Sequence, residues 1–200
     1  MKNLVINFIL LLLIVFLITC TGKKSENSIN TKKQNETHFG DGQEDDVKKL
    51  TEAAIDNTYE VKLANTAFDK GTSTEVKQLG ENLKKIHLKM NSELLALAAK
   101  KNIAIPSDLT NSQKRCMLRL SRKHGLTFDK DIVKYLRNKH EDAIDFYTDL
   151  AEESKDADIR AFANKELAEV HGHLADIEVC WEKIKDRKPP KTGVDHGDLR

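Results

Sequence analysis

Three histidines and one glutamate occupy positions where an amphipathic helix normally carries apolar residues. His87, His140 and His173 lie on or at the edge of apolar stripes of helical period, and Glu60 lies within another. Imidazole and carboxylate groups are common ligands of Zn, Fe, Mn and Cu. At about 1.5 Å per residue, the four residues lie about 18 to 26 Å from the nearest predicted turn. The spacing therefore predicts one layer at mid-height and indicates a candidate site for a single transition-metal ion.

The same residues also fit a metal-free polar layer. Buried histidines can hydrogen-bond to a facing carboxyl or amide, and Asn57 and Glu166 also fall within the stripes. The residues that stand three positions before His87, His140 and His173 are Lys84, Arg137 and Val170, respectively. None is a glutamate, so the Glu-x-x-His pairs of di-iron bundles are absent. We therefore expect neither ferroxidase nor oxygen-activating chemistry and no obligatory cofactor. The structural layer and the single-ion site stay open, and with them the question of enzymatic activity.

Long amphipathic segments must position these residues. The apolar spacing predicts helices over residues 45–68, 75–101, 128–154 and 156–185, with a short helix over 110–122 between the second and the third. Only 6% of residues are aromatic and alternating Val/Ile segments are scarce, which disfavours a β-sandwich or barrel. Two helical hairpins joined by a crossover that holds a short helix predict an all-α, ferritin-like four-helix bundle over residues 44–186.

The N-terminus predicts export and lipid anchoring. Lys2 precedes an almost wholly apolar run over residues 4–18, which is short for a spanning helix of about 20 residues. Cys20 ends this run and resembles the lipidated cysteine of a bacterial lipobox, so residues 1–19 are predicted to be a lipoprotein signal peptide. The alternative is an uncleaved anchor. Either places the folded part in the cell envelope, periplasm-facing or at the outer membrane, with the membrane as its first partner.

The segments that flank the bundle are polar, and the overall charge is balanced. Residues 20–43 are poor in large apolar side chains and predict a flexible tether, and residues 187–200 predict a disordered tail. The chain has 33 basic and 32 acidic side chains, a net charge of +1. This balance excludes binding to nucleic acid through bulk charge.

Two further cysteines fall inside the predicted bundle. Cys116 lies on the short helix that leads into the third long helix, and Cys180 lies near the end of the fourth, beside the start of the third. In an exported domain such a pair can form a disulfide that fixes the crossover to the bundle. Two buried free thiols are the alternative. A Cys-x-x-Cys redox motif is absent from the sequence.

With the helices placed, four stretches together resemble the DUF4142 family of bacterial envelope proteins. They are EVKLANTAFDKGTSTEVKQLGENL, HLKMNSELLALAAKKNIAIPSDL, GLTFDKDIVKYLRNKHEDAIDFY and DIRAFANKELAEVHGHL. The resemblance covers residues from about 47 to 185 and implies an exported, ferritin-like four-helix domain without an established reaction. It places the family's recurring helix-1 glutamate on Glu60 and its recurring histidines on His87, His140 and His173. The family often has Asp just before the first two histidines, where this chain has Ile86 and Lys139.

These observations lead to two expectations for function. The first is a lipid-anchored envelope protein with a non-enzymatic role, either structural or in binding a protein partner or small ligand. The second is a ferritin-like metal-binding protein that holds one ion of Zn, Fe, Mn or Cu with one glutamate and three histidines in the core. An exposed apolar groove would favour the first, and ligand atoms gathered around one point would favour the second.

Overall fold

The structure is a computed structural model, and it describes residues 30–35 and 44–189. The predicted signal peptide, Cys20, parts of the tether and nearly all of the tail lie outside the described residues. The long and short helices are α2 (Glu44–Lys70), α3 (Thr74–Lys100), α4 (Asn111–Ser121), α5 (Gly125–Glu153) and α6 (Ala157–Ile184). Residues 30–35 add a short helix, and no strand occurs over 30–35 or 44–189. The all-α prediction is confirmed, and the predicted helix bounds differ from these by at most three residues.

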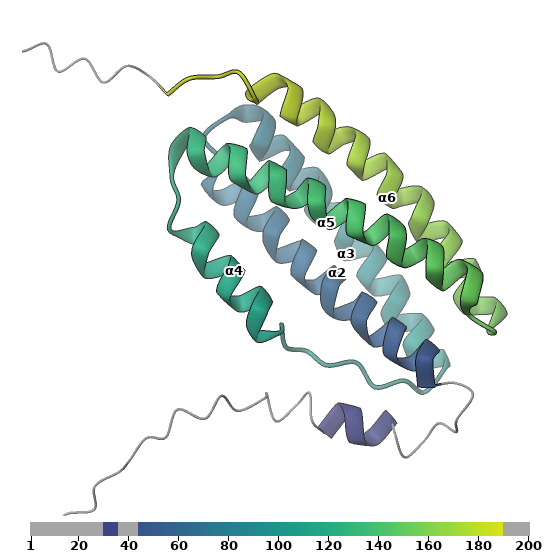
Figure 1. Cartoon of the computed structure of the whole chain (residues 1–200). Coiled ribbons are helices and arrows are strands. Elements are labelled where there is room, and N and C mark those ends of the chain that lie inside the picture. The colour runs from purple at the N-terminus through teal and green to yellow at the C-terminus, as the bar shows by residue number, and fades with distance from the viewer. Residues whose placement is uncertain (1–29, 36–43, 190–200) are drawn as a thin grey trace, which may run out of the picture.

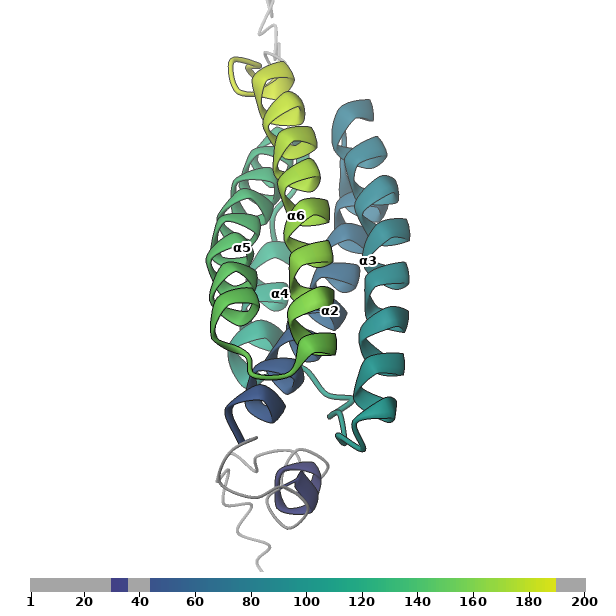
Figure 2. The same ribbon diagram turned by 90° about the vertical axis from the view of Figure 1, so that its right-hand side faces the viewer.

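The four long helices lie side by side around a common core. α2 packs along α3 and α5 along α6, while α3 contacts α6 and α2 contacts α5, so that the two hairpins close a ring (Figures 1 and 2). The crossover returns the chain to the α2–α3 turn, where α5 begins. Within it, α4 lies outside the ring against α2 and α5. This arrangement brings one face of every long helix to the same interior.

A buried carboxylate fastens the two hairpins together at that end. Asp129, in the first turns of α5, accepts hydrogen bonds from the backbone N–H groups of Thr72 and Ser73 at 2.9 and 2.8 Å and from the Thr72 hydroxyl at 2.7 Å. Its side chain is fully buried. Bonds to a charged acceptor are stronger than neutral ones, so this residue fixes where the α2–α3 turn sits relative to α5.

Close backbone approach joins α2 to α3 near the same turn. A Cβ placed on Gly80 of α3 would lie 2.5 Å from the Phe68 nitrogen and 2.6 Å from the Ala64 oxygen, both in the α2 backbone. Real Cβ atoms do not approach backbone so closely. Gly80 therefore lets the first hairpin pack more tightly than any other residue would allow.

The apolar interior consists of two clusters with a gap between them. One contains Tyr59 and Leu63 of α2, Leu83 of α3, Leu136 of α5 and Ile177 of α6. The other contains residues at Ala54, Met90, Tyr147 and Val170 of the same four helices. On the four long helices the boundary between the clusters falls at Asn57, His87, His140 and His173, which are polar stripe residues predicted from the sequence. The polar side chains thus form a layer that divides the core at mid-height, as the spacing predicts.

A short part of the predicted tether is attached to the helical domain. Residues 30–35 are helical, and the Asn35 side chain pairs with the backbone of Ala104 in the crossover. Its amide nitrogen donates to the Ala104 carbonyl at 3.0 Å, and its amide oxygen accepts from the Ala104 N–H at 2.9 Å. The polar composition that predicts a flexible segment carries no information on such a backbone contact 69 residues away.

The disulfide between Cys116 and Cys180 that the sequence leaves open is not formed. Both residues are free thiols, with Cys180 buried in the apolar interior and Cys116 half-buried on α4. Cys116 accepts a hydrogen bond from the Arg119 guanidinium at 3.4 Å. Although partial burial opposes the change, contacts with Tyr135, Tyr59 and Arg119 lower the pKa of the Cys116 thiol. The sequence places both residues near the start of α5, but a disulfide also requires side chains that point at one another.

Within the described residues, we find no helix whose length and apolar character would suit it to crossing a bilayer.

Candidate metal centre

The polar layer brings three predicted histidines to one point. His87 of α3, His140 of α5 and His173 of α6 are each at most 3% exposed. One ligand atom from each lies within 4.8 Å of the others. Their ring centroids are 5.4, 5.0 and 5.5 Å apart, and the rings are tilted by 58 to 73° from one another. Three helices thus present imidazoles almost symmetrically to a single centre.

Hydrogen bonds at the outer nitrogens determine which inner nitrogens carry lone pairs. The His140 Nδ1 lies 2.9 Å from the Leu136 carbonyl oxygen, which can only accept a hydrogen bond. The His87 Nδ1 lies 2.8 Å from the Asn57 amide oxygen, which also accepts. The His140 Nδ1 atom therefore carries its proton, and the His87 Nδ1 atom does so when the Asn57 amide oxygen faces it. In a neutral imidazole the Nε2 atom is then left as a bare acceptor.

The two Nε2 atoms face each other at 3.3 Å. With the Asn57 amide in this orientation neither has a proton to donate, and their lone pairs repel unless a cation lies between them; with the amide reversed, one ring donates to the other. In a tetrahedral zinc site with Zn–N bonds of about 2.0–2.1 Å, two ligand nitrogens are about 3.3–3.4 Å apart. The observed separation of these two atoms fits a tetrahedral ion, and it equally fits a hydrogen bond between the two rings.

The third histidine has no competing partner. Neither ring nitrogen of His173 makes a hydrogen bond within the described part of the chain, although the side chain is buried. Buried polar atoms are normally paired, and an unpaired one in a folded protein calls for an explanation. With ligand atoms at most 4.8 Å apart, a movement of no more than about 1.5 Å would bring His173 to the tetrahedral separation.

Burial also keeps these rings free of competing protons. Desolvation lowers the pKa of both His140 and His173 to about 4. Desolvation, together with the neighbouring His140 and His173, lowers the pKa of His87 well below its usual value. A metal ion binds the neutral imidazole, so at neutral pH the three rings are already in the form that binds metal.

Glu60 lies beside this group but is not part of it. Within the described residues, the group whose ligand atoms lie within 4.8 Å of one another comprises the three histidines, whereas Glu60 lines a cavity that also touches His87 and His140. Its Oε2 atom has no hydrogen-bond partner among the described residues, and burial raises the pKa of its carboxyl to about 8. Of the four residues predicted as ligands, the structure therefore gathers three and places the fourth in an adjoining cavity.

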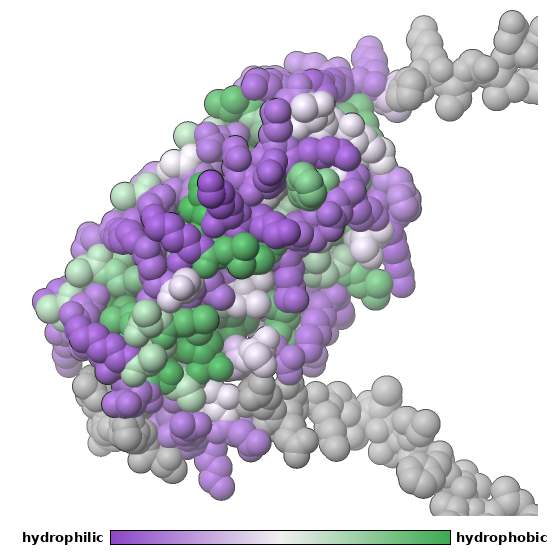
Figure 3. All heavy atoms as spheres, turned by 180° about the vertical axis from the view of Figure 1, so that it is seen from behind, coloured by the Kyte–Doolittle hydropathy of each residue, from purple (hydrophilic) through white to green (hydrophobic). Residues whose placement is uncertain are grey.

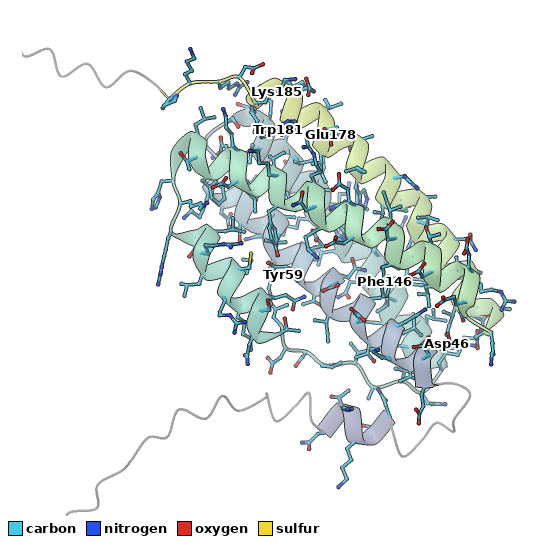
Figure 4. The ribbon with its side chains drawn as sticks, viewed as in Figure 1. Asp46, Tyr59, Phe146, Glu178, Trp181 and Lys185 are labelled. Atoms are coloured by element: carbon cyan, nitrogen blue, oxygen red, sulfur yellow. The ribbon has the colours of Figure 1, made fainter. Side chains whose placement is uncertain are left out.

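The cavity adjoins the histidines between α2 and α5 and has a volume of about 220 Å³. Its apolar wall includes Phe146 and Tyr147 of α5 and Met90 of α3. In the view of Figure 4, Phe146 is labelled between the ribbons of α5 and α2. Exposed acidic residues of α2 and α5 lie at its mouth, so the cavity connects the polar layer to the surface.

Asn57 and Glu166, the other two polar residues of the stripes, differ in whether they contact the histidines. Asn57 holds the His87 ring through the hydrogen bond at Nδ1, a role that the sequence leaves undefined. Glu166 is buried two helical turns before His173, and neither carboxyl oxygen has a partner in the described ranges. Burial raises the pKa of Glu166 to about 7. Asn57 belongs to the histidine layer, and Glu166 is a separate buried carboxyl.

Sequence reasoning missed a second polar cluster beside the layer. The hydroxyls of Tyr59 and Tyr135 are 2.9 Å apart, and Cys116 interacts with both. Tyr59 follows the helical spacing of α2 and reads as an ordinary core residue. Its contact with α5 depends on how the helices rotate against one another, which the pattern on one helix does not reveal.

The fold and the layer define an all-helical protein whose core is divided by a buried three-histidine group. Comparison with family models matches residues 31–179 to the Domain of unknown function (DUF4142), and the chain belongs to this family. The resemblance seen in the sequence is confirmed. Comparison with curated proteins and with solved structures finds no match. The chemistry of the site therefore has to be inferred from its own geometry.

Proposed function

We propose that this protein binds one transition-metal ion, with zinc as the best fit, through His87, His140 and His173. The observation that carries the proposal is the convergence of three buried imidazoles, two with Nε2 atoms 3.3 Å apart and the third, His173, without a hydrogen-bond partner among the described residues. Three neutral imidazoles from three helices form a ligand set typical of zinc. Asn57 and the Leu136 carbonyl supply the outer hydrogen bonds that orient metal-binding histidines in proteins.

The competing arrangement is a metal-free layer with the Asn57 amide reversed. The Asn57 nitrogen would then donate to His87 Nδ1, and His87 Nε2–H would donate to His140 Nε2. This network satisfies both rings, but it gives His173 no partner. The two arrangements differ in whether the histidines hold a metal ion, so a measurement of bound metal distinguishes them. Unpartnered His173 favours the metal.

Elemental analysis tests the proposal. The protein, purified without an affinity tag, is expected to hold near-stoichiometric metal after incubation with Zn²⁺ and dialysis, and His140→Ala is expected to lose it. His171→Ala is the matched control, because His171 is exposed on α6 two residues from His173. Absence of metal in the unsubstituted protein, after incubation with each of Zn, Fe, Mn and Cu, would refute metal binding and leave the histidines as a structural layer.

We further propose that the protein is a lipid-anchored, non-enzymatic envelope protein with a ferritin-like four-helix bundle. The apolar run that ends at Cys20 supports the anchor, and the ring of two hairpins with a crossover supports the ferritin-like arrangement. Incorporation of labelled fatty acid that is lost in Cys20→Ala would support lipidation. Recovery of the unsubstituted chain in the soluble fraction, without label, would contradict it.

Binding of an envelope partner stays a prediction. Among the described residues, the exposed large apolar side chains are those of Phe68, Leu88, Leu95, Leu118 and Val179, which come from four different helices. Leu88 and Leu95 of α3 are two turns apart. Figure 3 shows apolar atoms on the rear face divided by polar ones. Singly exposed apolar residues are normal on a soluble surface, and they support the partner role less than the histidine geometry supports metal binding.

A further inference from the structure

The histidine group leaves one coordination position without a protein ligand. Three ligands come from α3, α5 and α6, and a tetrahedral ion takes four. The remaining long helix, α2, faces the layer with Asn57 and Glu60. Asn57 is occupied by its hydrogen bond to His87, and Glu60 lies outside the 4.8 Å group. Sites with three protein ligands and an open position are those that exchange water for other molecules.

We propose that the open position faces the cavity between α2 and α5 and takes a small, neutral donor molecule with a compact apolar body, such as a nitrogen heterocycle. This inference rests on the proposed metal-binding function. The cavity touches His87 and His140 but not His173, which places it on the α2–α5 side of the ion. A molecule in the cavity therefore has direct access to the metal from that side.

The size and the lining of the cavity indicate the size and polarity of the ligand that fits it. Its volume of about 220 Å³ greatly exceeds the roughly 10–15 Å³ that one water needs on the same measure. The apolar part of the lining consists of Ala53, Met90, Ala143, Phe146, Tyr147 and Val170. The planes of Phe146 and Tyr147 are 82° apart, so a flat ring can stack on one of them and meet the other edge-on while one nitrogen binds the ion. Glu60 Oε2, buried and without a partner, offers a polar contact within the same space.

Charge at the mouth selects against anions. Glu52 and Asp56 of α2 and Asp142 of α5 line the cavity beside a single cation, Lys139. Lys139 is already paired with Asp142 at 2.6 Å. Asp56 also interacts with Lys139 and accepts a hydrogen bond from Gln113 at 2.6 Å. Three acidic side chains thus share one cation in the cavity lining, and the excess of acidic groups repels an approaching anion. A neutral donor meets no such penalty.

Cobalt spectroscopy tests this inference. The full-length chain, purified in detergent without a tag, is loaded with one equivalent of Co²⁺, whose visible absorption changes when a ligand in its coordination sphere is exchanged. Imidazole and azide are then titrated separately at constant ionic strength. Imidazole is expected to alter the spectrum saturably, with an affinity about tenfold or more above that of azide because of the acidic mouth. Asp56→Asn is expected to narrow this difference.

Replacing each of two alanines by leucine tests where the ligand binds. Ala143→Leu fills the cavity and is expected to weaken imidazole binding about tenfold or more without loss of cobalt. Ala161→Leu is the matched control, because Ala161 is exposed on α6 and should leave the titration unchanged. If Ala143→Leu does not fold, Phe146→Ala is used instead. It widens the cavity and is expected to improve binding of the larger benzimidazole relative to imidazole.

The outcomes separate the two proposals. Failure to bind cobalt would refute the metal site itself. Stoichiometric cobalt with a spectrum that neither probe changes would refute the open position and leave the metal site standing. A preference for azide, or equal loss of imidazole binding in Ala143→Leu and Ala161→Leu, would overturn the proposed ligand class or its place in the cavity.

Discussion

Replacing His173 by leucine is expected to stabilise the metal-free protein while abolishing its response to metal. Both ring nitrogens of His173 are buried and lack partners among the described residues. A leucine of similar size leaves no polar atom unpaired between the two apolar clusters. Replacing a buried polar group that has its hydrogen-bond partners normally destabilises a protein. A rise in stability on replacement of His173 is therefore expected only if its nitrogens lack partners.

The magnitudes follow from the burial and the size of the domain. An unsatisfied buried polar group costs about 1–3 kcal/mol. For a domain of this size, 1 kcal/mol corresponds to about 3 °C in Tm, so metal-free His173→Leu is expected to melt about 3–9 °C higher. Zinc at a hundred times its Kd stabilises the unsubstituted protein by about 2.7 kcal/mol, or about 8 °C. His173→Leu is expected to show none of this shift.

Thermal unfolding followed by circular dichroism, with chelator and with excess Zn²⁺, measures both effects. His171→Leu is the control, because His171 is exposed on the same helix and its replacement should leave the zinc shift unchanged. The reasoning is refuted if metal-free His173→Leu melts below the unsubstituted protein, since His173 must then have a hydrogen-bond partner. A zinc shift that survives in His173→Leu would equally remove this residue from the site.

Three further predictions concern the residues around the histidines. Asn57→Leu is expected to weaken zinc binding about 10- to 100-fold by releasing the His87 ring, and competition with a chromogenic chelator measures this; an unchanged affinity would remove Asn57 from the site. Burial raises the pKa of Glu60 to about 8 from an ordinary value near 4.5, so the folded chain keeps a proton that the unfolded chain loses between these values. The free energy of unfolding of the metal-free protein therefore gains a component that falls with rising pH, by at most about 1.4 kcal/mol per unit. Glu60→Gln lacks this component, so urea titrations from pH 5 to 8 should show its advantage growing, and a constant difference would contradict the argument. Asp129→Ala is expected to destabilise the protein by about 2–4 kcal/mol in urea unfolding, because three donors at the α2–α3 turn lose their acceptor, whereas exposed Asp145→Ala should change stability little.

The helices and the height of the polar layer were predictable because both depend on local pattern. Apolar periodicity sets the buried face of each helix, and 1.5 Å per residue sets the height of each residue along it. His87, His140 and His173 meet because they share a face and a height. The turn that Asp129 fastens was predicted as a break between helices, although its buried acceptor was not.

The remaining features depend on side-chain directions and on distant contacts. Glu60 shares the face and approximate height of the histidines, yet it points into a cavity beside them. Cys116 and Cys180 lie near the same end of the domain, but a disulfide needs a particular orientation of both side chains. The cavity itself is the space left by side chains from α2, α3, α5 and α6, and no single stretch of sequence encodes it.

The contact between Asn35 and Ala104 determines where mechanical load enters the domain. A pull on the chain that precedes Asn35 is resisted by two hydrogen bonds to one residue of the crossover, and both must stretch together. Force arriving from that direction is thus passed to the loop after α3 before it reaches the first turn of α2. These two hydrogen bonds therefore have to break before such a force can unwind α2 in the hairpin that carries His87.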